Sequence, residues 1–327
     1  MPTAPPIPSL RLPLRLGIST CLLGREVRYD GGHKRDPFLT DTLGQWVEWV
    51  GVCPEVEIGL GVPRESIRLE GAVTHPRLVA PKSGIDHTDA MTRFARERVE
   101  QLATLDLVGY VLKKDSPSCG MERVRVQLSP GRRAVARNGV GMFARALMSR
   151  LPLLPVGEEG RLHDPGLREN FIERVFAYAR WREALTAGMT RARLVAFHTA
   201  HKLLLMAHDP DAYRRLGRMV ARTRDRSLGA LLADYGAGFM GALRTLATPG
   251  RHANVLEHML GYLSDDLPSA ERRELVDLIR DHRRGLVPLV VPLTLVKHHV
   301  SRLGVEYLAG QVYLDPHPKE LMLRNHV

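Results

Sequence analysis

The first 165 residues alternate short apolar runs with stretches of helix length, and this alternation constrains the fold more than any other feature. Strand-like runs lie at residues 14–18, 107–112 and 151–156, each bounded by polar or turn residues. Between them, residues 88–105 repeat apolar side chains at helical spacing. Strands that alternate with helices of this length predict an α/β domain, with a mostly parallel sheet flanked by helices.

The remainder of the chain shows helical spacing alone. Phe171, Val175 and Tyr178 recur on one face, and turn signals such as DPD and TPG separate similar stretches further on. We therefore predict a separate all-α domain at the C-terminal end. The predicted boundaries are a proline-rich flexible arm at residues 1–13, an α/β domain at 14–165 and an all-helical domain at 166–327.

Composition limits the class of protein and of partner. Hydrophobic residues make up 44% and charged residues 25% of the chain, as in ordinary globular proteins. Neither a membrane-length apolar run nor a signal-peptide core is visible, so we expect a cytoplasmic protein with no membrane partner. The formal net charge is +11 and the pI is about 9.9, which indicates an anionic partner such as nucleic acid.

The chain has three cysteines, Cys21, Cys53 and Cys119, and each comes soon after an apolar run. Ligands of an open α/β sheet bind beyond the carboxyl ends of its strands. Three thiols delivered to three such ends are expected to meet at one point, although they lie far apart in sequence. An odd number of widely spaced cysteines also argues against a secreted disulfide framework.

The spacing alone leaves the role of the three thiols open. A free cysteine is most often a small buried hydrophobe. Structural zinc sites favour close pairs of cysteines, which this sequence lacks. A single catalytic cysteine would leave two thiols unexplained. An iron–sulfur cluster with one open iron would use all three.

Polar residues near the cysteines are candidates for a pocket. Glu55 follows Cys53 by two residues, and Ser116 and Ser118 precede Cys119 in the loop KKDSPSCG. A glycine turn downstream of Cys21 contributes Asp30. We predict Asp30 and Ser118 as substrate-pocket residues.

Four motifs in order, GISTCLLGREVRYDGGHK, CPEVEIGLGVPR, KKDSPSCG and PVGEEGRLHD, resemble the thiouracil desulfidase (TudS) family over about residues 14–165. The second half contains FHTAHKLLLMAHD, NVLEHMLGYL and VVPLTLVKHHV. It resembles the helical domain fused to the TudS domain in the RudS branch, which is associated with removing sulfur from 4-thiouridine in transfer RNA.

The resemblance implies a cofactor and a reaction. Cys21, Cys53 and Cys119 would hold a 4Fe–4S cluster by three irons, leaving the fourth for the substrate's sulfur. Glu55 would activate water, and Ser116 would hydrogen-bond the ring or the developing charge. The expected activity is hydrolytic conversion of 4-thiouridine in tRNA to uridine with release of sulfide. The alternatives are the same reaction on free thiouracils and a non-catalytic RNA-binding protein with a structural metal site.

Arginines in the second half are candidates for RNA contact. Arg218, Arg222 and Arg226 recur every four residues and would share one face of a helix. We predict that this stripe binds tRNA phosphates, the alternative being an ordinary solvated face.

Histidines suggest a competing enzyme class. His198, His201, His208, His298 and His299 resemble the donors of a helical metal-dependent phosphohydrolase, but their spacing does not complete a ligand set. We expect them instead to cap helices or to meet RNA phosphates.

Overall fold

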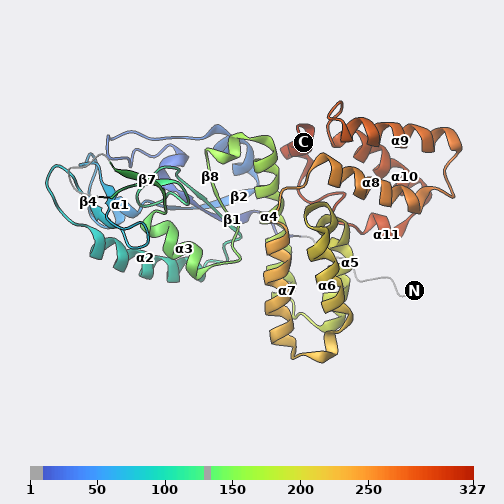
Figure 1. Cartoon of the computed structure of the whole chain (residues 1–327), viewed down its shortest axis with the longest axis horizontal. Coiled ribbons are helices and arrows are strands. Elements are labelled where there is room, and N and C mark those ends of the chain that lie inside the picture. Colours follow the sequence, from blue (N-terminus) through green and yellow to red (C-terminus); the bar gives the residue numbers. More distant parts are fainter. Residues whose placement is uncertain (1–9, 129–133) are drawn as a thin grey trace. The chain divides into compact units, whose positions relative to one another are not determined.

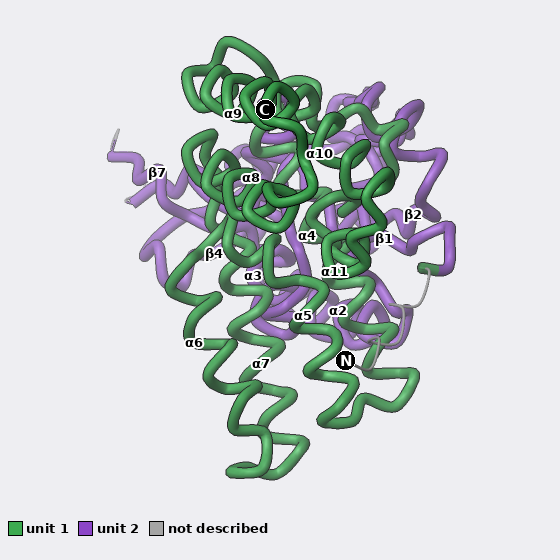
Figure 2. The backbone as a smooth tube through the Cα atoms, turned by 90° about the vertical axis from the view of Figure 1, so that its right-hand side faces the viewer, with its two compact units in different colours: residues 1–10, 165–327 green, residues 11–164 purple. Residues whose placement is uncertain are grey.

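The computed structural model describes residues 10–128 and 134–327 (Figure 1). Residues 11–164 form one compact unit, and residues 165–327 belong to another (Figure 2). We call them the cysteine unit and the helical unit. The arm predicted at residues 1–13 lies mostly outside the described residues, and the first strand begins at Leu14.

Four parallel strands form one sheet of the cysteine unit, in the order β2-β1-β5-β8. Their bounds are Leu14–Ser19 for β1, Val47–Val52 for β2, Gly109–Leu112 for β5 and Val156–Glu158 for β8. Leu14 pairs with Val47 and Ser19 with Val52, so the chain leaves β1 and β2 at the same edge. This sheet and the helical C-terminal part confirm the predicted fold class.

The strand predicted at residues 151–156 is wrong in position. Strand β8 starts only at Val156. Pro152 and Pro155 lie in the predicted run, and proline has no backbone N–H for a sheet ladder.

A second four-stranded sheet, absent from our sequence prediction, lies in the same unit in the order β4-β3-β6-β7. Its strands are β3 Arg68–Glu70, β4 Arg77–Val79, β6 Val124–Gln127 and β7 Val135–Gly139. Strands β3 and β4 have three residues each, which is too short for an alternating pattern of apolar and polar residues to be recognised in the sequence.

Helices α2, Thr88–Ala103, and α3, Met142–Arg150, pack side by side in the cysteine unit (Figure 1). Phe143 of α3 lies near Tyr110 of β5 and Phe94 of α2, with ring centroids 6.0 and 6.2 Å away. A Cβ on Gly17 would come within 2.1 Å of the Tyr110 ring. Glycine at position 17 therefore leaves room for the Tyr110 ring to pack against strand β1.

The helical unit consists of helices joined by short turns. They are α4 Pro165–Thr186, α5 Arg191–His208, α6 Pro210–Ala221, α7 Leu228–Ala242, α8 Pro249–Leu263, α9 Ser269–Arg283, α10 Val290–Leu303 and α11 Glu306–Ala309. Side chains of Thr190, Asp209, Ser227 and Thr248 accept N–H groups at the starts of α5 to α8. Of the helices described in either unit, none is apolar over enough of its length to cross a bilayer.

The histidines of α5 belong to the interior of the helical unit. His198 is hydrogen-bonded to the Tyr235 hydroxyl at 3.1 Å, and His201 to the Phe197 carbonyl at 2.7 Å. Burial lowers the pKa of His198 to about 4 and that of His201 to about 3, so both are neutral near pH 7. The expectation that these two histidines cap helices or meet phosphates is wrong, because their rings pack in the core.

Buried charges connect α4 to the C-terminal end of the helical unit. Arg324 donates to Glu169 at 2.9 Å and to Glu173 at 3.2 Å. His208 donates from Nε2 to Glu173 at 2.6 Å and from Nδ1 to the Thr245 carbonyl at 2.6 Å. Two carboxylates are thus balanced by one guanidinium and one imidazolium, away from water.

Candidate functional site

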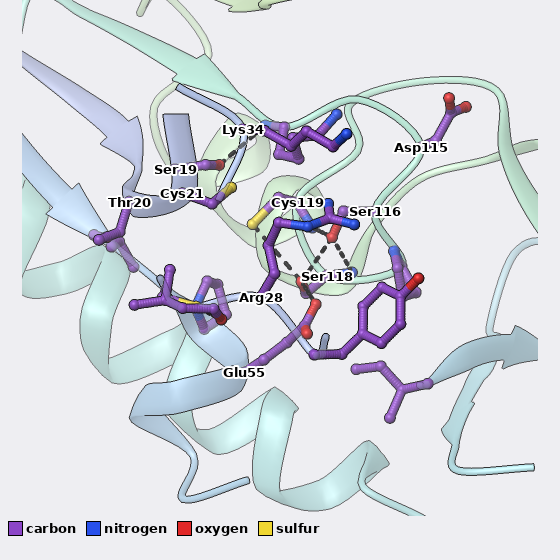
Figure 3. Close-up of a pocket in the computed structure, with 18 of the residues that line it drawn as sticks. Ser19, Thr20, Cys21, Arg28, Lys34, Glu55, Asp115, Ser116, Ser118 and Cys119 are labelled. Carbon is purple, nitrogen blue, oxygen red and sulfur yellow. Dashed lines mark hydrogen bonds between the residues drawn. The ribbon is translucent and has the colours of Figure 1, made fainter. Parts of the chain in front are cut away.

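A cavity of about 380 Å³ opens beyond the ends of β1, β2 and β5. All three cysteines contribute to its lining, and Figure 3 shows Cys21 and Cys119 pointing toward one another. Each follows a different strand of one parallel sheet, which is why residues so distant in sequence reach the same place.

Cys21 and Cys53 occupy tight turns directly after their strands. Cys21 lies in the 3-10 turn Thr20–Leu23, and its carbonyl accepts the N–H of Lys34 at 2.9 Å. Cys53 is the N-cap of the short helix α1, Pro54–Glu57. Its N–H donates to Glu57 at 3.0 Å, and its sulfur lies 3.7 Å from the Val27 carbonyl. Both residues are therefore held by hydrogen bonds of their own backbone groups.

The loop of Cys119 is held by the start of helix α3. The Ser118 carbonyl accepts the N–H groups of Phe143 and Ala144 at 3.0 and 3.2 Å. A Cβ on Gly141 would come within 2.5 Å of that same carbonyl oxygen. Glycine at position 141 therefore allows the loop to approach the helix closely.

Two carboxylates at the end of β8, on Glu158 and on the next residue, Glu159, hold the ends of the same loop. Glu159 pairs with the Lys113 ammonium at 2.5 Å and accepts the Lys114 N–H at 2.8 Å. Glu158 accepts the N–H of Met121 at 2.8 Å. The two glutamates of the motif PVGEEGRLHD therefore hold the loop that contains Cys119.

Burial governs the chemistry of the three thiols. It raises the pKa of Cys21 to about 11, and it also raises the pKa values of Cys53 and Cys119. All three are neutral thiols near pH 7 unless a metal replaces their protons. The sulfur atoms therefore need a cationic partner to act as thiolates.

This donor set fits an iron–sulfur cluster better than a single ion. Within residues 10–128 and 134–327, no three side chains of Cys, His, Asp or Glu are grouped to hold one metal ion. A cluster does not need that grouping, because each thiolate binds its own iron. Three sulfur donors around one cavity match a cluster that leaves one iron without a protein ligand.

Glu55 is fixed at the cavity by two partners. Its Oε1 accepts the Ser118 hydroxyl at 2.8 Å, and its Oε2 accepts the Arg64 guanidinium at 2.5 Å. The side chain of Glu55 is 14% exposed and that of Arg64 only 5%. Because each carboxylate oxygen can accept two hydrogen bonds, Glu55 retains capacity for a bound water.

Ser116 and Ser118 form a hydrogen-bonded chain that ends at Glu55 (Figure 3). Ser118 donates its only hydroxyl proton to Glu55, so Ser116 is the donor across their 2.9 Å contact. The Ser116 oxygen also accepts the N–H of Cys119 at 3.1 Å. In this arrangement Ser116 holds the loop, and it would have to turn its proton to reach a substrate.

Asp30 is not among the residues that line the cavity. It pairs with Arg28 at 3.2 Å, and its side chain is 45% exposed. Arg28 itself lines the cavity, and its guanidinium lies 5.3 Å from the centre of the Tyr29 ring. Tyr29 is 44% exposed and presents an aromatic ring to the same space.

Sequence analysis missed Arg64 and the two glutamates at the end of β8, Glu158 and Glu159. Arg64 lies within the motif CPEVEIGLGVPR, nine residues after Glu55, but nothing in that spacing indicates an ion pair. Its Nη1 donates to the carbonyls of Val27 and Gly61 at 3.0 and 2.9 Å. Arg64 therefore connects Glu55 with the segment that touches the Cys53 sulfur.

The predicted arginine stripe of the helical unit is not a single helical face. Helix α6 ends at Ala221, so Arg222 caps it and Arg226 lies beyond a 3-10 turn. Arg226 pairs with Asp234 of α7. Arg218, Arg222 and Arg226 are all exposed, but only Arg218 is on α6.

Comparison with protein families assigns the two parts of the chain separately. Residues 16–159 match the sequence model of a family described as 2-thiouracil desulfurase. Residues 202–318 match a family described as protein of unknown function, DUF1722.

Individual proteins are also similar to this chain. The uncharacterized protein YbgA of Escherichia coli (strain K12) is 34% identical over 158 residues, which cover 48% of this chain and 94% of YbgA. YbbK of Bacillus subtilis (strain 168), also uncharacterized, is 29% identical over 32% of this chain and 71% of its own. A solved structure described as the [4Fe-4S]-dependent thiouracil desulfidase TudS is 30% identical. The match covers 46% of this chain and 93% of the chain in that structure, with a TM-score of 0.38.

Proposed function

The chain belongs to the family of E. coli YbgA and carries a 2-thiouracil desulfurase domain at residues 16–159, and from this premise we propose that it removes sulfur from 4-thiouridine in tRNA. The observation that carries the proposal is the meeting of three cysteine thiols and Glu55 in the lining of one cavity. The net reaction replaces C=S by C=O, consuming water and releasing hydrogen sulfide, so no electron donor is required.

Cys21, Cys53 and Cys119 would hold the 4Fe–4S cluster, which when bound supplies a soft Lewis-acid site for the thiocarbonyl sulfur. Glu55 binds and orients the attacking water and accepts its proton. Ser118 and Arg64 keep the carboxylate in place. Tyr29 offers its exposed ring as a stacking surface for the base, which has to leave its stack to enter the cavity.

A polynucleotide substrate agrees with the charge of the chain. The formal net charge of +11 favours an anionic partner. We assign the RNA contact in part to the helical unit, in keeping with its resemblance to the RudS-type helical domain. A second candidate substrate is free thiouracil, which is favoured by the description of the matched family.

The proposal is tested by anaerobic reconstitution with iron and sulfide, followed by incubation with tRNA that contains 4-thiouridine. We expect the red-shifted absorbance of the thiolated base to disappear and sulfide to be released. A Cys119→Ala variant should do neither. Turnover of free thiouracil with intact tRNA would assign the second substrate. A fully loaded protein inactive on both would overturn the proposed reaction.

Loss of the Arg64 guanidinium is expected to reduce turnover without loss of the cluster. Arg64→Lys keeps the charge but cannot make the paired contacts to Glu55, and changes in such outer partners cost about 10–100-fold in activity. We expect kcat to fall within that range while KM and the cluster absorbance change little. Arg35→Lys, at an exposed ion pair with Asp41, is the matched control. An Arg64→Lys enzyme with unchanged kcat would remove Arg64 from this role.

A further inference from the structure

A strongly basic stretch of the cysteine unit begins shortly after the loop of Cys119. Residues 123–157 contain seven arginines and no aspartate or glutamate. Arg150 pairs with a glutamate of α2, and Arg145 donates to two backbone carbonyls. The other arginines of this stretch that the structure describes lie at the hairpin of β6 and β7: Arg123, Arg125 and Arg137. They are exposed, and none of them takes part in an ion pair with a described residue.

Two of these arginines lie opposite one another on the solvent face of the second sheet. Val126 of β6 pairs with Ala136 of β7, so Arg125 faces Arg137 across the antiparallel ladder, at a β-bulge. Val126 is buried, and successive side chains of a strand point to opposite faces, so Arg125 points away from the core. Like charges that face each other directly are destabilising in a sheet, and an anion bound between them removes this repulsion.

The rest of the second sheet supplies little negative charge to the hairpin. Its four strands contain one carboxylate, Glu70 of β3, which is buried. Arg68 donates to Glu70 at 2.7 Å, and Arg77 lies 3.7 Å from its other oxygen. Glu122, directly before the basic stretch, pairs with Arg161. The positive charge of the hairpin is therefore left for a partner from outside the unit.

The base of the hairpin is fixed to the loop that carries Cys119. The N–H of Gly141, two residues after β7, donates to the Gly120 carbonyl at 2.7 Å. A Cβ on Gly120 would come within 2.4 Å of the Val124 side chain, so glycine allows the loop to approach β6 closely. Arg125 is six residues from Cys119, which is at most about 22 Å of extended chain. A polynucleotide whose base lies in the cavity can therefore also reach the hairpin.

We propose that the β6–β7 hairpin binds backbone phosphates of the RNA, through Arg125 and Arg137 together with Arg123, at a surface separate from the cavity. None of the three arginines lines the cavity. The inference rests on the proposed action on RNA and adds a contact surface to it, on the cysteine unit rather than on the helical unit alone. Guanidinium groups suit this role, because their N–H donors match the oxygens of a phosphate in pairs.

The test measures binding of a tRNA transcript that lacks 4-thiouridine to the full chain, by fluorescence anisotropy over a range of KCl concentrations. For Arg125→Gln and Arg137→Gln we expect the dissociation constant to rise about three- to tenfold each, as for the loss of one exposed contact to a charged group. The slope of log affinity against log salt should fall by about one for each arginine removed. Arg125→Lys and Arg137→Lys keep the charge and should retain most of the affinity.

The matched control is the double variant Arg93→Gln, Arg96→Gln. Both arginines are exposed on α2 of the same unit, and Glu97 and Glu100 follow them at helical spacing. The control removes as much charge as the hairpin double variant, so its tRNA affinity should stay close to that of the wild type if the hairpin itself binds RNA. Circular dichroism and cluster absorbance of the hairpin double variant should match the wild type.

Because the measurement needs no turnover, it is independent of the proposed reaction. A wild-type protein that binds tRNA through the hairpin but removes no sulfur would overturn the reaction and leave this surface standing. Equal affinity and equal salt slope for the hairpin variants and the wild type would overturn the surface and leave the reaction standing. An equal loss in the hairpin and α2 double variants would assign the effect to net charge and would also overturn the surface. Tighter binding of polyglutamate than of tRNA at the same salt would make an acidic protein the partner instead.

Discussion

The Glu55→Gln variant is expected to bind the cluster as the wild type does and to lose about 10²–10⁴-fold in kcat/KM, the usual contribution of a positioned acid–base group. Glutamine has nearly the same shape and can still accept the Ser118 hydroxyl, but it cannot take a proton from water. The measurement is the initial rate of 4-thiouridine loss at matched cluster content.

A control variant on the preceding strand makes this result specific. Glu48 of β2 is exposed and pairs with Arg15, away from the cavity, so Glu48→Gln should retain full activity. A Glu55→Gln enzyme with wild-type turnover and an intact cluster would contradict the role given to Glu55. A variant that fails to take up the cluster would instead make Glu55 a structural residue of the cysteine site.

The second large effect concerns the stability of the helical unit. We expect Arg324→Met to lower its free energy of unfolding by about 3–5 kcal/mol, because removal of one partner leaves buried charge uncompensated. Both Glu169 and Glu173 would lose a partner at about 3 Å. Denaturant unfolding followed by circular dichroism measures the change. Arg302→Met, which removes an exposed contact to Glu271, should cost about 0–1 kcal/mol.

The same network predicts the direction of the pH dependence. Burial alone would raise the pKa of Glu169 and Glu173, but the neighbouring cationic groups lower both below 4.5. Their contribution is therefore present above pH 4.5 and is lost as the pH falls through the folded-state values. Burial lowers the pKa of His208, but the neighbouring Glu173 carboxylate raises it by more. The net result is a pKa above 6.5. Its contribution is present below pH 6.5 and is lost as the pH rises through the folded value.

Acid unfolding provides a second test of Arg324. Without its guanidinium, the pKa values of Glu169 and Glu173 move back toward 4.5, so the acid midpoint of Arg324→Met should lie at a higher pH than that of the wild type. Equal acid midpoints for Arg324→Met, Arg302→Met and the wild type would show that the buried pairs do not control stability.

Sequence patterning located the strands that carry the cysteines and missed the second sheet. The run at residues 14–18 falls within β1, and the run at 107–112 includes β5. Strands β3 and β4 have three residues each and leave no periodic signal. The helices were easier to predict, because 12 or more residues give several turns of repeated spacing.

Within the site, the sequence was informative about residues next to the cysteines and silent about their partners. Glu55 and Ser118 lie within two residues of a cysteine and do line the cavity, whereas Asp30 does not. Arg64 pairs with Glu55 only because the chain folds back nine residues later. Glu159 follows strand β8 and reaches Lys113, which follows strand β5 and is 46 residues away in sequence.

The sequence by itself determined the alternation of strands and helices and the position of each cysteine after a strand, because both follow from local spacing. Only the tertiary structure decided which groups neutralise one another. Arg28, Arg64 and Lys113 have carboxylate partners, whereas Lys34 and Lys114 have none among the described residues. Composition counts all five as equal positive charges. Their difference arises from distances between side chains, since charge interactions depend on separation and burial rather than on order along the chain.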